Sequence, residues 1–353
     1  MPLLARSVQT PLHIEVRRGA VADLGKILAD GRISSGGDVA VVVGPGLGEQ
    51  IVDLLRPSLN SAEVYVTSGG TLDAALDLSA KLRSGHYDAV VGIGGGKTVD
   101  TAKYAASRWG LPMVSVATSL ANDGIASPVA SLINDGIKGS YGVHIPFGVV
   151  VDLDFVESGP DRVNRAGIGD VVSNISALAD WELAREMRGE SVDGLASSLS
   201  RMGAEAVLSM PGDMTDDAFV TTLAEALISS GLAMAVAGTS IPCSGGCHEI
   251  MHATDSLFPN TASHGELAGL GALFCTFLRG DERRLKQMSD CLARHQLPRT
   301  PSDVGLDADQ FAQVIEFAPR TRPDRYTILE HLAMTPEQTR QKLAEYNDVI
   351  ATL

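Results

Sequence analysis

Residues 89–100 read Ala89-Val90-Val91-Gly92-Ile93-Gly94-Gly95-Gly96-Lys97-Thr98-Val99-Asp100. The first five are apolar or glycine, which is typical of a strand buried on both faces, and the remainder opens a helix. Glycines let a phosphate approach the backbone closely, and a helix N-terminus supplies free N–H groups and positive potential. The stretch therefore predicts a diphosphate cradle at the end of a buried strand. A tight turn is the alternative, but three consecutive glycines exceed what a turn needs.

Neither of two common nucleotide-binding motifs fits this stretch. A P-loop needs a glycine five residues before Gly96, and Val91 stands there. A standard dinucleotide fingerprint lies on the first strand of its sheet, whereas several predicted strands precede residue 89. The glycines therefore predict phosphate binding without identifying the nucleotide.

Strands and helices alternate on both sides of the glycine stretch, which predicts an α/β, Rossmann-like parallel sheet with ligands at the carboxyl ends of its strands. From about Pro160 onward, helical periodicity continues to the end of the chain. We therefore expect an α/β domain at residues 1–157 and an all-α domain at residues 158–353. Apolar runs predict strands at residues 12–16, 39–43, 62–66, 89–93, 111–116 and 148–153, helical spacing occupies residues 21–29 and 72–82 and a stretch ending at Leu55, and residues 131–143 read as a hairpin.

Length and composition exclude several classes of protein. A chain of 353 residues has room for about two domains with sizeable cores. The net charge of −15 argues against a nucleic-acid partner and against an anionic membrane surface. Residues 226–247 form the longest uncharged run, but serine, glycine and proline interrupt it, so we expect a buried helix and a loop rather than a membrane span. Residues 1–10 show no export signal and the four cysteines lack metal or disulfide spacing, so we expect a cytoplasmic protein with reduced thiols.

Three of the eight histidines fall within residues 240–266. His248 and His252 are four residues apart and project from one face of a helix, and His264 follows. Imidazole is the commonest metal ligand, so this window predicts a metal site, although each histidine alone could satisfy a helix locally. His248-Glu249-x-x-His252 also matches the zinc-protease motif, in which the glutamate activates water, but the residues before it read as a loop rather than a long protease helix.

A polar segment at residues 117–128 follows one of the predicted strands. Its hydroxyl and amide side chains can hydrogen-bond a nucleotide or a polyol, although the same residue types also form ordinary caps and turns. Asp170 follows two near-adjacent glycines at a predicted helix start. It is either a capping aspartate or a carboxylate metal ligand.

Three arginines, Arg320, Arg322 and Arg325, precede another predicted helix start. They either steady a phosphate or stay on the surface, and the sequence alone does not choose between these roles.

Taken together, these motifs resemble those of the sn-glycerol-1-phosphate dehydrogenase family, within the superfamily of iron-containing alcohol dehydrogenases and dehydroquinate synthases. The resemblance covers nearly the whole chain, and the Asn-Asp-Gly-Ile-Ala-Ser-Pro run is its most specific part. The motifs are Gly94-Gly95-Gly96-Lys97-x-x-Asp100, Thr118-Ser119-x-x-Asn122-Asp123-Gly124-Ile125-Ala126-Ser127-Pro128, Ala166-Gly-x-Gly169-Asp170, His248-x-x-x-His252, His264-Gly265-Glu266 and Arg322-Pro-x-Arg-Tyr-Thr-Ile-Leu329.

The resemblance implies a dehydroquinate synthase-like fold and a role for each motif. It implies that Asp170, His248 and His264 hold one divalent metal ion, with zinc expected and nickel or iron as alternatives. Asp123 and His252 would contact the substrate, and the protease role of the glutamate falls away. The NAD or NADP cofactor would be lined by Gly94, Gly95, Gly96, Lys97, Asp100, Thr118, Ser119, Asn122 and Ser127.

The implied reaction is reduction of dihydroxyacetone phosphate to sn-glycerol 1-phosphate by NAD(P)H. Alternatives are another small phosphate or phosphonate carbonyl compound or a polyol as substrate, or a sugar-phosphate cyclase that resembles dehydroquinate synthase. Two departures from the family pattern matter: residues 243–247 are atypical, and Gly44 stands where an acid would select NAD, which leaves NADP open. An apolar helical domain is also compatible with a homo-oligomer.

Overall fold

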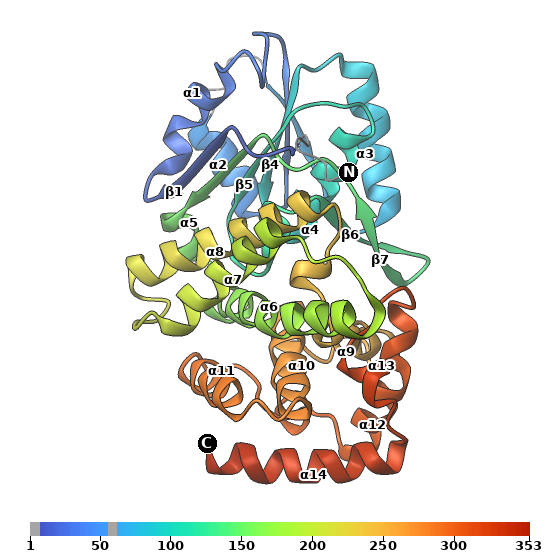
Figure 1. The fold of residues 1–353 in the computed structure, drawn as a ribbon. Coiled ribbons are helices and arrows are strands. Elements are labelled where there is room, and N and C mark those ends of the chain that lie inside the picture. The colour runs from blue at the N-terminus through green and yellow to red at the C-terminus, as the bar shows by residue number, and fades with distance from the viewer. Residues whose placement is uncertain (1–7, 56–61) are drawn as a thin grey trace. The chain divides into compact units, whose positions relative to one another are not determined.

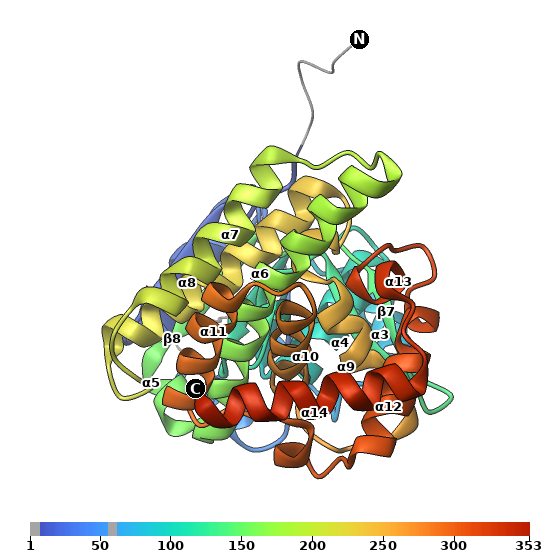
Figure 2. The same ribbon diagram turned by 60° about the horizontal axis from the view of Figure 1, so that its bottom comes forward.

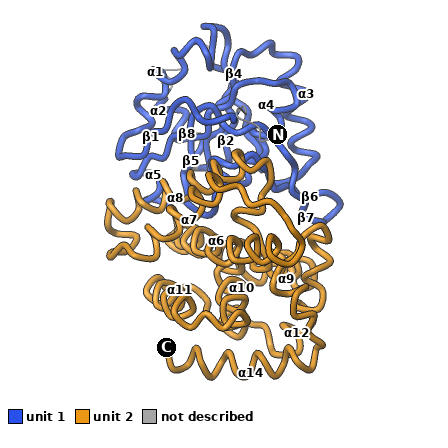
Figure 3. Tube along the Cα trace, in the orientation of Figure 1, with its two compact units in different colours: residues 1–159 blue, residues 160–353 orange. Residues whose placement is uncertain are grey.

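The computed structural model describes residues 8–55 and 62–353 and divides into two compact units, Met1–Gly159 and Pro160–Leu353 (Figure 3). Most of residues 1–10, the segment in which no export signal is expected, lies outside the described ranges.

The first unit is built on a six-stranded sheet in which every neighbouring pair of strands is parallel (Figure 1). The strand order is β1-β8-β5-β4-β2-β3, so the chain moves outward in one direction from β2 and in the other from β4. This confirms the predicted parallel sheet and puts its topological switch point between β2 and β4, where ligands of such sheets bind. The strands are β1 (His13–Arg17), β2 (Val39–Val43), β3 (Glu63–Val66), β4 (Ala89–Gly94), β5 (Met113–Ala117) and β8 (Gly148–Asp152).

Alternate side chains of β2 pack on opposite faces of the sheet, which explains why apolar runs form its central strands. Val39, Val41 and Val43 pack on one face of the sheet with α1 and α2, whereas Ala40 and Val42 pack on the other face with α3 and α4. Successive side chains of a strand point to opposite faces, so a strand covered on both sides needs an unbroken apolar run. The helical elements of this unit are η1 (Ala20–Asp23), α1 (Leu24–Leu28), α2 (Leu47–Leu55), α3 (Leu72–Gly85), α4 (Gly96–Ser107), η3 (Asp123–Ile125) and α5 (Leu153–Ser158).

The predicted hairpin is confirmed as β6 (Val129–Asn134) paired antiparallel with β7 (Ile137–Gly142). Its two turn residues, Asp135 and Gly136, have φ of 50° and 79°. Left-handed conformations at both central residues are the mark of the tight hairpin turn that matches strand twist.

The second unit is helical, as predicted, and its C-terminal helix α14 lies beside α12 (Figure 2). One prediction about it is wrong: the helix carrying Asp170 begins at Asp161, so the glycines before Asp170 lie inside the helix and Asp170 is not a cap. The helical elements are α6 (Asp161–Arg188), α7 (Gly194–Ser209), α8 (Asp217–Ala237), η4 (Ile241–Cys243), α9 (Gly246–Leu257), α10 (His264–Leu278), α11 (Glu282–Arg294), η5 (Pro301–Val304), α12 (Ala308–Phe317), η6 (Ala318–Thr321), α13 (Ile328–Leu332) and α14 (Pro336–Thr352).

Helix α8 is long and apolar enough to cross a bilayer by length and composition alone. However, 67% of its most apolar window is buried inside the protein, which is typical of a core helix. The helix ends at Ala237 and a loop follows, so the prediction of a buried helix and a loop at residues 226–247 is confirmed.

His295, which follows α11, gives this unit a predicted pH dependence. Burial, and secondarily the charge of Arg294, lower the pKa of His295 from 6.5 to about 4. Between these pH values the unfolded chain binds a proton that the folded chain excludes, so the free energy of unfolding should fall as the pH drops from 6.5 to 4, by at most about 3 kcal/mol. Urea unfolding of the wild type and of His295→Phe, which keeps a ring against Phe219, would measure it. Equal pH dependence in the two proteins would contradict this role.

Candidate metal and cofactor sites

The packing of α6 against α10 brings two candidate metal ligands together. A Cβ on Gly169 would lie 2.2 Å from the carbonyl oxygen of Gly265, and one on Gly265 would lie 1.9 Å from that of Ala166. Only glycine allows the two backbones to approach this closely. Gly169 weakens the interior of α6 as a helix, but it makes the close packing against α10 possible. Asp170 follows Gly169, and His264 precedes Gly265 at the first position of α10, so the contact sets both side chains face to face.

Helix α9, which carries the third candidate ligand, is anchored by a buried carboxylate on α6. Asp180 accepts hydrogen bonds from the backbone N of Gly246 at 2.9 Å and of Ile328 at 2.7 Å, and it pairs with Arg279. One side chain therefore fixes where α9 begins and where the segment before α13 lies. His248 is in the first turn of α9, so its position follows from this anchor.

Asp170, His248 and His264 converge on one point. Asp170 Oδ1 lies 3.5 Å from His248 Nε2 and 3.2 Å from His264 Nε2, and one donor atom from each residue lies within 4.8 Å of the others. A tetrahedral ion with bonds of about 2.1 Å places its ligand atoms about 3.4 Å apart, and both distances from the carboxylate to the imidazoles are close to this value. A carboxylate with two imidazoles also suits a catalytic ion, which keeps a coordination position open.

The electrostatics of the cluster favour an ionised carboxylate. Burial by itself raises the pKa of Asp170, but hydrogen bonds to His248 and His264 and the charges of both rings outweigh it and hold the pKa well below its usual range. Asp170 and His248 are buried, while the His264 side chain is 25% exposed. Asp170 is thus a buried carboxylate between two imidazoles, and His264 forms the accessible side of the cluster.

The other two members of the protease-like motif do not join this cluster. His252 Nε2 lies 2.8 Å from Arg322 Nη2, and Glu249 Oε2 accepts a hydrogen bond from Thr327 Oγ1 at 3.0 Å. Burial, and then the charge of Glu330, raise the pKa of Glu249 to about 9, so its carboxyl is neutral at pH 7. A neutral, fully buried carboxyl is no general base for water, so the geometry does not support the protease alternative.

If the chain is the reductase that the resemblance implies, we expect Glu249→Gln to retain full activity, because glutamine reproduces the size and the hydrogen-bonding ability of a neutral carboxyl. Steady-state oxidation of NAD(P)H by the variant and the wild type, with equal metal content, would test this. Complete loss of activity in a variant that still binds metal would give Glu249 a chemical role after all.

In the first unit, the glycine stretch and the polar segment meet at the ends of β4 and β5. Gly94 ends β4 with φ of 155°, Gly95 caps α4, and the carbonyl oxygen of Gly94 accepts from Thr118 N at 3.1 Å. A Cβ on Gly95 would lie 3.2 Å from Ser119 Oγ, and one on Gly96 would lie 3.8 Å from Asn122 Nδ2. Backbone groups at the start of α4 and short polar side chains therefore share one surface, which can accept a diphosphate and a ribose.

Other predicted cofactor residues take different positions. Lys97 is exposed in the first turn of α4. Asp100 is buried, and its Oδ2 accepts from Ser131 N at 3.0 Å. The Ser127 hydroxyl donates to the carbonyl of Val129 at 3.2 Å. Asp100 and Ser127 thus bond to the protein itself, and their contact with a cofactor stays a prediction.

Lys103, on α4, organises this region and was not found by sequence reasoning. Its Nζ is buried and lies 2.9 Å from Asp100 Oδ1, and it donates to the carbonyl oxygens of Gly124 at 2.7 Å, Ser127 at 3.3 Å and Val129 at 2.5 Å. These carbonyls belong to the segment that carries Asp123, so Lys103 fixes its shape. The sequence signal for this role is that Lys103 occupies an apolar position of a buried helix, three residues after Asp100.

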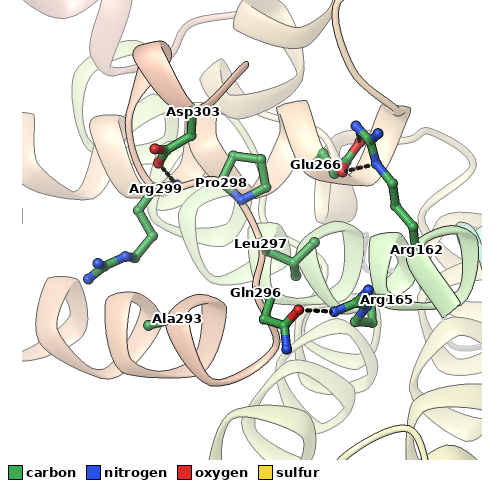
Figure 4. Close-up of a pocket in the computed structure, with 9 residues that line it drawn as sticks. All are labelled: Arg162, Arg165, Glu266, Ala293, Gln296, Leu297, Pro298, Arg299 and Asp303. Atoms are coloured by element: carbon green, nitrogen blue, oxygen red, sulfur yellow. Dashed lines mark hydrogen bonds and ion pairs between the residues drawn. The ribbon is translucent and has the colours of Figure 1, made fainter. Parts of the chain in front are cut away.

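A pocket of about 580 Å³ in the second unit is lined by three arginines (Figure 4). Their guanidinium groups are bound to neighbouring side chains, as is common on protein surfaces. Arg162 Nε donates to Glu266 at 2.8 Å, Arg165 donates to Gln296 at 2.8 Å, and Arg299 donates to Ser289 Oγ at 3.2 Å. Each guanidinium already has a protein partner, and we assign this pocket no ligand.

Comparison with known proteins first identifies the class. A family model described as iron-containing alcohol dehydrogenase matches residues 15–160. The structure superposes on that of a probable glycerol dehydrogenase from Sinorhizobium meliloti with a TM-score of 0.79 and 20% sequence identity, covering 99% of this chain and 100% of that one. The parallel sheet followed by a helical unit is therefore the fold of the iron-containing alcohol dehydrogenases.

Two relatives narrow the class to a family. Both are named glycerol-1-phosphate dehydrogenase (NAD(P)+). The protein from Methanosarcina mazei is 32% identical over 331 residues, covering 92% of each chain, and that from Methanospirillum hungatei is 35% identical over 335 residues, covering 92% of this chain and 90% of the relative. The chain belongs to the glycerol-1-phosphate dehydrogenase family, which confirms the resemblance and the prediction of an NAD(P)-dependent oxidoreductase.

Proposed function

We propose that the protein reduces dihydroxyacetone phosphate to sn-glycerol 1-phosphate, with NADH or NADPH and one divalent metal ion. The observation that carries the proposal is the convergence of Asp170, His248 and His264. The relatives' names add the substrate and the cofactor. The buried, free cysteines and the largely buried α8 support the cytoplasm as its location.

The second unit would hold the ion through one carboxylate oxygen and two imidazole nitrogens, a donor set for which zinc is our first choice. Bound there, such an ion supplies Lewis-acid polarisation of the substrate carbonyl. His252 and Asp123 would contact the substrate. Because Arg322 is always a donor, His252 Nε2 accepts its hydrogen bond, and a neutral imidazole then carries its proton on Nδ1. We therefore assign to the Nδ1–H of His252 a hydrogen bond to an oxygen of the substrate.

The first unit would bind the nicotinamide cofactor on the glycine stretch and the polar segment, and the reduced nicotinamide supplies the hydride. A Cβ on Gly44, just after β2, would lie 2.8 Å from Thr98 Oγ1. A side chain at this position would require Thr98 to move, and glycine leaves no acid that would discriminate against a 2′-phosphate, which supports use of both NADH and NADPH.

Consumption of NADH and NADPH with dihydroxyacetone phosphate would test the proposal, using protein loaded separately with zinc, nickel or iron(II). We expect metal-dependent oxidation of both cofactors and formation of the sn-1 enantiomer, determined by chiral analysis of the product. If phosphate is released without net cofactor oxidation, the protein is a cyclase. If only another carbonyl compound is reduced, the oxidoreductase class survives and the substrate is wrong.

A further inference from the structure

A tight turn after η6 places two arginines beside helix α9. Arg325 N donates to the carbonyl oxygen of Arg322 at 3.0 Å, which closes the turn. Arg322 Nη2 lies 2.8 Å from His252 Nε2, one helical turn after His248, and Arg325 Nη2 donates to Ser240 Oγ at 2.8 Å just before η4. The two guanidinium groups therefore contact the chain on both sides of the candidate metal ligand His248.

The guanidinium of Arg325 makes few hydrogen bonds for a largely buried group. Its Nε and Nη1 atoms are buried and lack hydrogen-bond partners among the described residues. Other arginines of this unit are paired with carboxylates: Arg279 with Asp180, Arg284 with Glu205 and Arg162 with Glu266. A buried N–H left without a partner costs about 1–3 kcal/mol, more for a charged group, and unlike Arg279, whose Nε is also unpartnered, Arg325 forms no ion pair that offsets this cost among the described residues.

The neighbouring charges reinforce this interpretation. Burial lowers the pKa of Arg322 and of Arg325, and the charge of Arg322 lowers the pKa of Arg325 further, although Asp324 and Glu249 offset part of these shifts. Two half-buried cations on one turn therefore repel each other. An anion with several acceptor oxygens would relieve the repulsion, and phosphate matches the fork of a guanidinium.

We propose that Arg322 and Arg325 bind the phosphate group of the substrate. The inference rests on the proposed function and adds the part of the site that recognises a phosphorylated substrate. His248 and His252 are separated by about one turn, or roughly 6 Å along the helix axis. In a triose phosphate, a methylene and an ester oxygen separate the carbonyl carbon from phosphorus, a span that suits a carbonyl near His248 and a phosphate near Arg322. Arg320, by contrast, is exposed and lies over the Phe317 ring, so the structure separates it from the pair.

Kinetics of Arg322→Met and Arg325→Met, with Arg320→Met as the matched control, would test the inference. For each of the first two we expect kcat/KM for dihydroxyacetone phosphate to fall about 10- to 100-fold, with unchanged KM for NADPH. Arg325→Lys should recover part of the loss, because an ammonium still binds phosphate as a point charge. The control should match the wild type. Loss of affinity for NADPH instead of the triose phosphate would assign the arginines to a cofactor phosphate and overturn the inference.

Calorimetric titration with inorganic phosphate gives a readout that does not depend on turnover. The metal-loaded wild type and Arg320→Met should bind phosphate, and both Arg322→Met and Arg325→Met should bind it at least about tenfold more weakly. Phosphate binding that is absent from the wild type, or equal in all variants, would overturn the inference even if the enzyme reduces the triose. Phosphate binding that is lost in the variants of an enzyme inactive on the triose would uphold the anion site and reject the proposed function.

Discussion

Replacing Asp170 with asparagine is expected to lower kcat/KM at least about a thousandfold, since loss of the bound ion removes several kcal/mol of transition-state stabilisation. Asparagine keeps the shape of the side chain, so the approach of α6 to α10 should survive while the anionic ligand is lost. The metal content of the purified variant, measured by mass spectrometry, should fall together with the oxidation of NAD(P)H.

Glu182→Gln is the matched control, because it removes a carboxylate from the same helix at a side chain that is 40% exposed and pairs with Arg185. This control should retain both metal and activity. An Asp170→Asn protein that holds a full equivalent of metal and works at the wild-type rate would remove Asp170 from the ligand set. A variant that keeps metal but loses activity would show that the charge of the carboxylate matters more than its coordination.

The identity of Asp170 as a candidate ligand came from its motif, but its setting did not. Near-adjacent glycines before an aspartate usually mark a helix start, and the helix instead begins nine residues earlier, at Asp161. Gly169 serves a contact with a helix almost one hundred residues away, at Gly265. Local patterns carry no information on such a partner, so a residue that looks like a cap from sequence lies in the interior of a helix, close to two imidazoles.

The α/β part was more predictable, because central strands such as β2 and β4 are unbroken apolar runs and the alternation with helices leaves few topologies. The polar groups that support its loops were not predictable. Lys103 acts on carbonyls of the segment at 124–129, and one lysine in a helix gives no sign of which backbone it will meet. The sequence places three arginines together at residues 320–325, and only the fold shows that Arg320 is exposed and lies over the Phe317 ring.

Replacing Lys103 with methionine is expected to lower the free energy of unfolding by about 3–5 kcal/mol, because removing one partner leaves the other buried charge uncompensated. The change strands Asp100 and leaves the carbonyls of Gly124, Ser127 and Val129 without their common donor. The segment that carries Asp123 should then lose its fixed shape, so kcat/KM should fall at temperatures where the variant remains folded. Urea unfolding followed by kinetics at low temperature would separate the two effects.

Lys81→Met, at an exposed lysine of α3, is the matched control and should change neither quantity. The double variant Lys103→Met with Asp100→Asn tests whether the charge of Asp100 causes the loss of stability. If the cost of losing Lys103 comes from the stranded carboxylate, neutralising Asp100 in the same chain should restore part of the stability, and the two changes will not be additive. Restored stability with activity still low would show that Lys103 also acts by shaping the segment around Asp123. Full recovery of stability and activity would mean that Lys103 only balances the charge of Asp100. Additive losses of stability would mean that Asp100 and Lys103 act independently.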